Sequence, residues 1–117
     1  MEINLQTILT RLNIEQLSPM QQRVWEAGRK GDDLILLSPT GTGKTLAFLL
    51  PLVEALRPGM NGVQAVVLVP SRELALQIEQ VFKAMGTGFK VMSCYGGRPA
   101  MEEHRTMKGI SPAVIIG

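Results

Sequence analysis

One stretch of this chain has the residue types and the spacing of a phosphate-binding loop. It runs Ser38-Pro39-Thr40-Gly41-Thr42-Gly43-Lys44-Thr45, between the apolar run at 34–37 and a helical pattern that starts at Leu46. Glycines allow the backbone to turn its N–H groups inward, and the start of a helix adds unpaired N–H donors. Lys44 is placed to reach terminal phosphates, and the Thr45 hydroxyl is placed to bind Mg²⁺. Ser38 departs from the strict motif, which has glycine at that position.

Two elements must position this loop. The apolar residues within 33–37 predict a strand that leads into it. After the loop, apolar residues recur at helical spacing from Leu46 to Leu56 and predict a helix. Pro51 lies inside that pattern and is expected to kink the helix or to end its first part.

The rest of the chain alternates between helical and strand patterns. Helices are expected over 5–12, from Ser18-Pro19 towards 28–31, over 72–85 and over 99–107; further strands are expected over 65–69, 90–95 and 113–116. Ser18 is a favourable N-cap, Pro19 suits the first helical position, and Gln21 completes a capping box. This alternation predicts an α/β fold with a mainly parallel sheet of about four strands. A nucleotide is then expected at the carboxyl ends of the strands.

Composition sets broad limits on the class of protein. The chain has 117 residues, 45% apolar and 19% charged, which indicates one globular domain. Its net charge of +2 permits nucleic acid as a partner without requiring it. Cys94 is the only cysteine, which excludes an internal disulfide and fits a cytoplasmic setting; it is expected to be a buried small residue in a strand. His104 stands alone in a polar stretch, and no signal peptide or membrane span is predicted.

Three further segments accompany the phosphate loop in a fixed order. Asn13-Ile14-Glu15-Gln16-Leu17-Ser18-Pro19-Met20-Gln21 precedes it, Pro70-Ser71-Arg72-Glu73-Leu74-Ala75 follows the strand expected at 65–69, and Gly96-Gly97 follows the strand expected at 90–95. Together these segments resemble the Q motif, motif I, motif Ia and the GG motif of the DEAD-box family of ATP-dependent RNA helicases. The resemblance runs from about Asn13 to Gly117. It implies a RecA-like P-loop NTPase fold, with residues 1–117 as the N-terminal portion of the first RecA-like domain.

The resemblance assigns roles to individual residues. Gln21 corresponds to the glutamine that reads adenine, and Ile14 stands where the family usually has an aromatic residue on the adenine ring. Asn13 and Leu17 replace a usual glycine and proline. ATP and Mg²⁺ are the implied ligands, with Lys44 and Thr45 as the catalytic pair. The loop residues implied to hold the phosphates are Thr40, Gly41, Thr42, Gly43, Lys44 and Thr45, and those implied to contact RNA are Pro70, Ser71, Arg72, Gly96 and Gly97.

Other interpretations of the same residues remain open at this point. Gln21 has a purely structural alternative in the capping box. Arg72 and Glu73 have one in ordinary helix-start chemistry, with Ser71 as the N-cap and Glu73 favoured by the helix dipole. A RecQ-like DNA helicase fits the phosphate loop but not residues 70–75. A GTPase lacks its Asn-Lys-x-Asp motif here. A nucleotide- or RNA-binding module without activity is the third alternative.

The family's remaining catalytic elements do not occur in these 117 residues. There is no Asp-Glu-Ala-Asp box, no Ser-Ala-Thr motif and no second RecA-like domain with its arginines. The resemblance therefore implies that a longer parent couples ATP hydrolysis to RNA unwinding or remodelling, while this chain alone has negligible ATPase activity. In the family, later strands enter the middle of the sheet. Their absence predicts unpaired strand edges, and with them self-association or an altered strand order.

Overall fold

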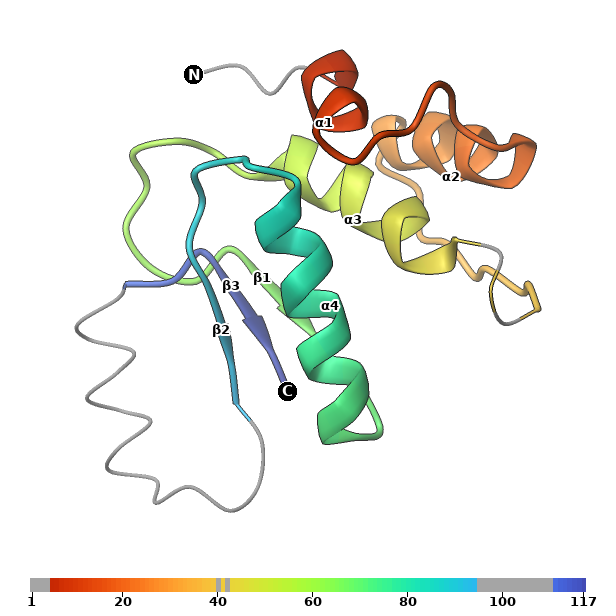
Figure 1. Ribbon diagram of the computed structural model, residues 1–117. Helices are drawn as coiled ribbons and strands as arrows, with labels where there is room; N and C mark the ends of the chain where they lie inside the picture. The colour runs from red at the N-terminus through yellow and green to blue at the C-terminus, as the bar shows by residue number, and fades with distance from the viewer. Residues whose placement is uncertain (1–4, 40, 42, 95–110) are drawn as a thin grey trace.

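A parallel sheet flanked by helices forms the centre of the fold (Figure 1). The computed structural model describes residues 5–39, 41, 43–94 and 111–117. Its three strands lie in the order β1-β3-β2, so the last strand enters between the first two. In chain order the elements are α1 (Leu5–Arg11), α2 (Pro19–Arg29), α3 (Lys44–Ala55), β1 (Ala65–Val67), α4 (Arg72–Ala84), β2 (Val91–Ser93) and β3 (Val114–Ile116). The predicted α/β class with a parallel sheet is confirmed.

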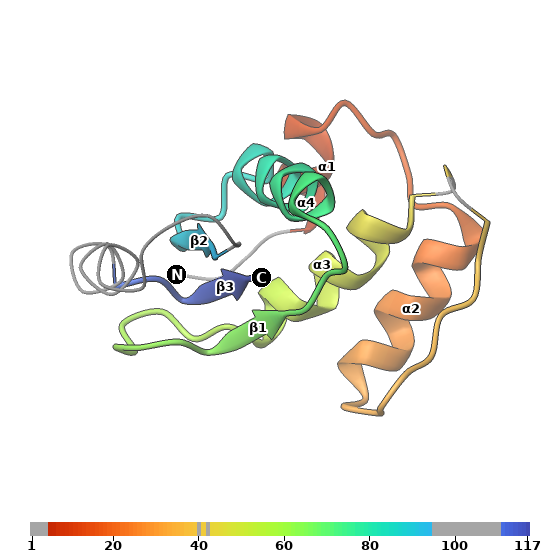
Figure 2. The ribbon, with the colours of Figure 1, turned by 90° about the horizontal axis from the view of Figure 1, so that it is seen from below.

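The core lies between the sheet and helices α3 and α4, with α4 across one face of the sheet and α2 outermost (Figure 2). β3 is the central strand and pairs in parallel with both neighbours, placing Val114 opposite Ala65 and Val91. The largest fully buried side chains come from α3, from α4 with its C-cap Met85, and from β3 with the nearby Pro112: Phe82, Leu49, Leu50, Met85, Ile116, Val53, Val114 and Pro112. The apolar faces of α3 and α4 therefore hold these two helices in the core.

Helix α2 begins as its sequence predicts. The Ser18 hydroxyl accepts from Gln21 N at 3.2 Å, and the Gln21 side chain accepts from Ser18 N at 2.9 Å. Pro19 occupies the first helical position. The predicted capping box is thus confirmed, and it fixes where the chain enters α2.

Helices α2 and α3 pack closely through two residues of special shape. Gly28 of α2 lies against Pro51 of α3, and a Cβ atom at Gly28 would collide with the Pro51 side chain. Pro51 lies inside α3, and the helix continues beyond it to Ala55. The expectation that the proline ends the first part of the helix is therefore wrong.

The strand predicted over 33–37 is wrong. These residues form no strand, and the side chains of Ile35 and Leu37 are 91% and 89% exposed. The apolar run indicates a buried strand, but a strand also needs a neighbouring backbone to pair with. The described sheet offers none there, since its three strands pair only with one another and β1 pairs only with β3. The described sheet therefore has three strands where about four were predicted.

Several other expectations have plain outcomes. Cys94 follows β2 and is half-buried rather than buried within a strand. The helix predicted over 99–107, together with His104, lies outside the described residues. None of the helices in the described part of the chain is both long enough and apolar enough to cross a membrane.

The contact between Gly28 and Pro51 predicts the sign of a stability change. Gly→Ala within a helix ordinarily stabilises by up to about 1 kcal/mol. Because the new methyl group collides with Pro51, we expect Gly28→Ala instead to lower the free energy of unfolding by about 1–3 kcal/mol. Urea denaturation followed by circular dichroism measures this change. A stabilised Gly28→Ala variant would show that the two helices do not pack through this residue.

Candidate functional site

The phosphate loop has the backbone conformation that its glycines predict. Gly41 and Gly43 have φ angles of 84° and 87°, in the left-handed region that favours glycine. Thr40 and Thr42, the other two residues at the tip of the loop, lie outside the described residues. The sequence requirement for glycine at 41 and 43 is therefore conformational.

Helix α3 starts at the end of this loop with its first turn open. Its N-cap is Gly43, which has no side chain to accept from the first-turn N–H groups. The Gly43 carbonyl oxygen accepts from Ala47 N at 3.1 Å, the first hydrogen bond of the helix. N–H donors and the positive end of the helix dipole thus point towards the loop, which suits an anion.

Lys44 spans the loop in this structure. Its Nζ atom donates to the Ser38 carbonyl oxygen at 2.7 Å, which joins the two ends of the loop. The ammonium is thereby already held at the loop, within the same cavity wall as Gly41, Gly43 and Thr45. A phosphate oxygen in this loop would offer Lys44 a charged acceptor in place of a neutral carbonyl, and such hydrogen bonds are about twice as strong.

A cavity of about 610 Å³ lies beside the loop. That volume falls within the range of roughly 300–1,000 Å³ that ordinarily holds small-molecule ligands. Its lining combines the loop, the end of β1 with the residues after it, and one side of α4: Leu36, Gly41, Gly43, Lys44, Thr45, Phe48, Val67, Leu68, Val69, Leu74, Gln77 and Ile78. The residues predicted to hold phosphates and Mg²⁺ are thus brought together, as far as they are described.

The donors in this cavity fit a magnesium-bound polyphosphate. Lys44 supplies positive charge, the start of α3 supplies N–H groups, and Thr45 supplies a hydroxyl oxygen. Within the described ranges no group of three or more His, Cys, Asp or Glu side chains is placed to hold a metal. Mg²⁺ commonly keeps several waters and binds through substrate phosphates with few protein ligands, so Thr45 and the phosphates match its needs.

The two residues predicted to recognise adenine lie in different surroundings. Gln21 is 8% exposed, and its side-chain amide donates to the Gly43 carbonyl oxygen at 3.2 Å. Ile14 is half-buried and packs against the hydrophobic core. Neither lines the 610 Å³ cavity, whereas Gln21 touches the loop directly.

A second, smaller cavity lies at the carboxyl ends of the strands. Its volume is about 240 Å³, and its lining is Val69, Pro70, Ser71, Arg72, Ala75, Cys94 and Gly117. The Ser71 hydroxyl accepts from Leu74 N at 3.2 Å. Ser71 therefore caps α4, as the alternative of ordinary helix-start chemistry predicted. The cavity thus contains the three described residues that were predicted to contact RNA, and Gly96 and Gly97 lie outside the described residues. Cys94 belongs to this wall, although its apolar sequence surroundings had indicated a buried strand position.

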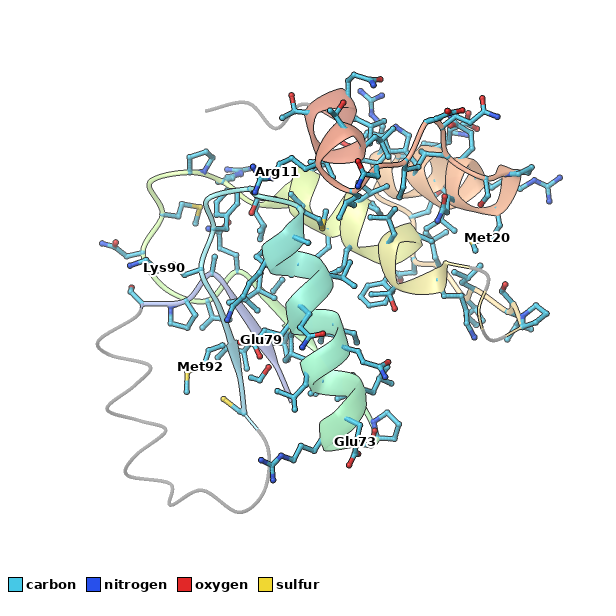
Figure 3. The ribbon with its side chains drawn as sticks, viewed as in Figure 1. Arg11, Met20, Glu73, Glu79, Lys90 and Met92 are labelled. Carbon is cyan, nitrogen blue, oxygen red and sulfur yellow. The ribbon has the colours of Figure 1, made fainter. Side chains whose placement is uncertain are left out.

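Helix α4, which lines both cavities, is fixed to β2 by a polar contact. Ser93 Oγ donates to Glu79 Oε2 at 3.0 Å, and Glu79 also pairs with Lys83 at 3.1 Å. The label of Glu79 marks this part of α4, beside the sheet, in Figure 3. Ser93 is 6% exposed, so its hydroxyl needs this partner. Val69, two residues after β1, lines both cavities.

Comparison with known proteins identifies the family. The model of the DEAD/DEAH box helicase family matches residues 18–117. The chain belongs to this family. It is 35% identical over 116 residues to the DEAD-box ATP-dependent RNA helicase CshA of Bacillus subtilis, covering 97% of this chain and 23% of that protein. It is 37% identical over 105 residues to the ATP-dependent RNA helicase eIF4A of Aspergillus oryzae, covering 88% and 25%.

Solved structures of DEAD-box helicases share the fold. Mss116 bound to single-stranded RNA and AMP-PNP superposes with a TM-score of 0.82 at 30% identity, over 94% of this chain and 24% of that one. Prp28 of Chaetomium thermophilum bound to ADP gives a TM-score of 0.77 at 32% identity, over 93% and 28%. The chain therefore spans about a quarter of the length of these helicases.

Removal of the Lys44 ammonium tests the phosphate site. We expect Lys44→Ala to weaken Mg·ATP binding by about 10- to 100-fold, because a charged hydrogen bond contributes about 1.5–3 kcal/mol. Isothermal titration calorimetry measures this loss. Lys30→Ala is the control, since Lys30 is exposed at the end of α2 and absent from the cavity lining. Equal affinity of both variants for Mg·ATP would contradict the assignment of the cavity.

Proposed function

We propose that residues 1–117 are the N-terminal portion of the first RecA-like domain of an ATP-dependent RNA helicase. The observation that carries this proposal is the shared wall at Val69, which joins the cavity of Lys44 and Thr45 to the cavity of Ser71 and Arg72. A helicase needs its nucleotide and RNA sites to sense one another, and a residue in the lining of both cavities is a direct physical route. The whole protein would couple ATP binding and hydrolysis to RNA unwinding or remodelling.

In this proposal the phosphate loop binds Mg·ATP. Lys44 offsets negative charge on the terminal phosphates, and the N–H groups of the loop and of α3 surround their oxygens. The Thr45 hydroxyl is the protein's ligand to Mg²⁺. Bound Mg·ATP supplies the phosphoryl group. Thr40, Gly41, Thr42 and Gly43 complete the loop, while Ile14 and Gln21 recognise the base.

RNA is the proposed ligand of the smaller cavity. Arg72 stands in the first turn of α4, where the guanidinium and the positive end of the helix dipole favour the same phosphate. Pro70 and Ser71 lie beside it, and Gly96 and Gly97 are proposed to approach the sugar-phosphate backbone. The solved structure of Mss116 with single-stranded RNA supports RNA over the DNA of a RecQ-like enzyme.

Catalysis by the isolated chain is expected to be negligible. The 117 residues hold no Asp-Glu-Ala-Asp sequence to work with Lys44 and Thr45. An arginine finger alone contributes about 10³–10⁵ in rate in related phosphoryl-transfer enzymes. We therefore assign to this chain ligand binding rather than turnover, and a cytoplasmic location is proposed from its single cysteine.

Salt dependence tests the RNA site. We expect Arg72→Ala to weaken binding of single-stranded RNA and to reduce the log–log salt slope by about 0.7, the value for one phosphate contact. Fluorescence anisotropy at several salt concentrations gives both numbers. Arg57→Ala is the control, because Arg57 is also exposed but precedes β1, whereas Arg72 follows it. If Arg72→Ala left the affinity for RNA and the salt slope unchanged, the proposal that RNA binds this cavity would be wrong.

The free edge of β1 supports a further proposal, self-association of this chain. Val66 and Leu68 are 59% and 83% exposed, and the described sheet leaves this edge without a partner strand. An exposed apolar edge is a template for pairing with a second copy.

Light scattering tests this pairing. We expect a mass above the 12.8 kDa of the single chain at high protein concentration, and a return to 12.8 kDa for Leu68→Lys. A lysine on the edge opposes pairing between copies. Met60→Lys, at an exposed loop residue, is the matched control. A wild-type chain that stays at 12.8 kDa throughout would overturn the proposal.

A further inference from the structure

The loop between α3 and β1 is closed at its base by one side chain. Gln64 Oε1 accepts from Arg57 N at 2.7 Å, and Gln64 Nε2 donates to the Arg57 carbonyl oxygen at 3.0 Å. The Gln64 amide thus pairs with both backbone groups of Arg57. Residues 58–63 form the wide bend between these two ends (Figure 1). The base of the loop is therefore fixed independently of its tip.

The tip of this loop is open to solvent and lightly held. All residues of 58–63 are exposed. Gly59 and Gly62 have φ angles of 79° and 93°, and a Cβ atom at either would meet nothing within 4 Å. Among the described residues, no hydrogen bond holds the Asn61 side chain or the Gly62 N–H. Asn61 and Gly62 therefore lack the contacts that would keep the side chain away from the backbone.

Asn61-Gly62 is a pair in which the backbone can attack the side chain. Glycine has no Cβ atom, so the Gly62 nitrogen has open access to the side-chain amide carbon of Asn61. After that nitrogen loses its proton, it forms a bond to Asn61 Cγ, and the bond from Cγ to Nδ2 breaks. Ammonia leaves with the proton, and a cyclic succinimide remains.

Water completes the reaction at this succinimide. Addition of water at Cγ breaks the bond from Cγ to the Gly62 nitrogen and gives aspartate. Addition at the main-chain carbonyl carbon of Asn61 breaks the original peptide bond and gives isoaspartate. Overall an amide and a water become a carboxylate and an ammonium ion, without an oxidant or a reductant. The net charge of the chain falls by one from its value of +2.

We infer that Asn61 is a site of spontaneous deamidation, which converts it to aspartate and isoaspartate and gives the loop a negative charge. The inference goes beyond the proposed nucleotide and RNA sites and does not depend on them, since residues 57–64 line neither cavity. The new carboxylate shares its loop with two exposed apolar residues, Met60 and Val63. The chain then exists in two charge forms whose proportion changes with its age.

Asn13 shows how the structure selects between asparagines. Asn13 is also exposed, but the nitrogen that follows it, Ile14 N, donates to the Leu9 carbonyl oxygen at 2.9 Å. Attack by Ile14 N would break this hydrogen bond, and the β-branched Ile14 side chain crowds the approach. Asn4, the third asparagine of the chain, lies outside the described residues. Of the two described asparagines, Asn61 is therefore the reactive one.

The base of the loop confines the effect of the reaction on the fold. Isoaspartate adds one carbon to the backbone, and the two hydrogen bonds between Gln64 and Arg57 keep this extra length within the loop. Gln64 N also donates to the Ala113 carbonyl oxygen at 2.8 Å, which fixes the chain just before β1. Deamidation is therefore expected to change the charge of the chain and to leave its helices and sheet in place.

Mass spectrometry of the 117-residue chain, incubated at mildly alkaline pH, tests the inference. We expect a product in which oxygen replaces an amide NH, and peptide mapping should locate it at Asn61. Conversion at Asn61 is expected to be at least about tenfold faster than at Asn13, because the hydrogen bond and side chain of Ile14 obstruct the second reaction. A peptide with the sequence of residues 58–64 is the unrestrained reference, and the folded chain should convert within about tenfold of its rate.

Three variants locate the reaction and its consequence. Asn61→Gln keeps an amide on a longer side chain, so we expect the product to disappear over the same incubation. Asn13→Gln makes the same change at the other exposed asparagine and should convert as wild type does. Asn61→Asp supplies one product directly. We expect it to coincide with the acidic form of the aged wild-type chain on ion exchange, with an unchanged circular dichroism spectrum and urea midpoint.

Each result bears on the inference without reference to ATP or RNA. If Asn61 keeps its amide while the reference peptide converts, the loop protects the side chain and the inference is wrong. Equal conversion at Asn13 and Asn61 would show that the structure does not select the site, which would also overturn the inference. A lower urea midpoint for Asn61→Asp would contradict the confinement of the change to the loop.

Discussion

The hydrogen bonding of the Gly43 carbonyl oxygen is the constraint on which the site depends. This oxygen accepts from Ala47 N, which starts α3, and from Gln21 Nε2, which ties α3 to α2. Gly43 itself ends the phosphate loop in a left-handed conformation. The phosphate loop, the start of α3 and the link between α2 and α3 therefore meet at the peptide group of Gly43. The orientation of this group sets where the N–H donors point.

Two cavities lie beside the helices and strands of this site, and Val69 lines both of them. Helix α3 carries Lys44 and Thr45 at one end and packs its apolar residues against the sheet along the rest. Val67 at the end of β1 and the two residues after it line the 610 Å³ cavity, and the chain then continues to Arg72 at the second cavity. Helix α4 is held to β2 through Glu79 and Ser93. Val69 and helix α4 are thus common to the linings of both cavities.

The exposure of the apolar residues within 33–37 results from the lack of a partner strand in the described sheet, and their composition does not predict it. Residues 33–37 have the apolar character of a buried strand, yet Ile35 and Leu37 are almost fully exposed. A strand is completed by the backbone of its neighbours, and the described sheet ends at β1. Leu36 from this segment and Val67 to Val69 at the end of β1 and after it are among the residues that line the 610 Å³ cavity.

The sequence by itself determined the features that depend on neighbouring residues. The capping box of Ser18 and Gln21, the Ser71 cap of α4, the glycines at 41 and 43 and the parallel sheet class were all predictable, because contacts within three or four residues and apolar periodicity control them. Only the tertiary structure decided whether 33–37 joins the sheet, that Cys94 lines a cavity, and that Gln21 reaches Gly43. Each of these depends on atoms brought from far along the chain, whose positions no local pattern records.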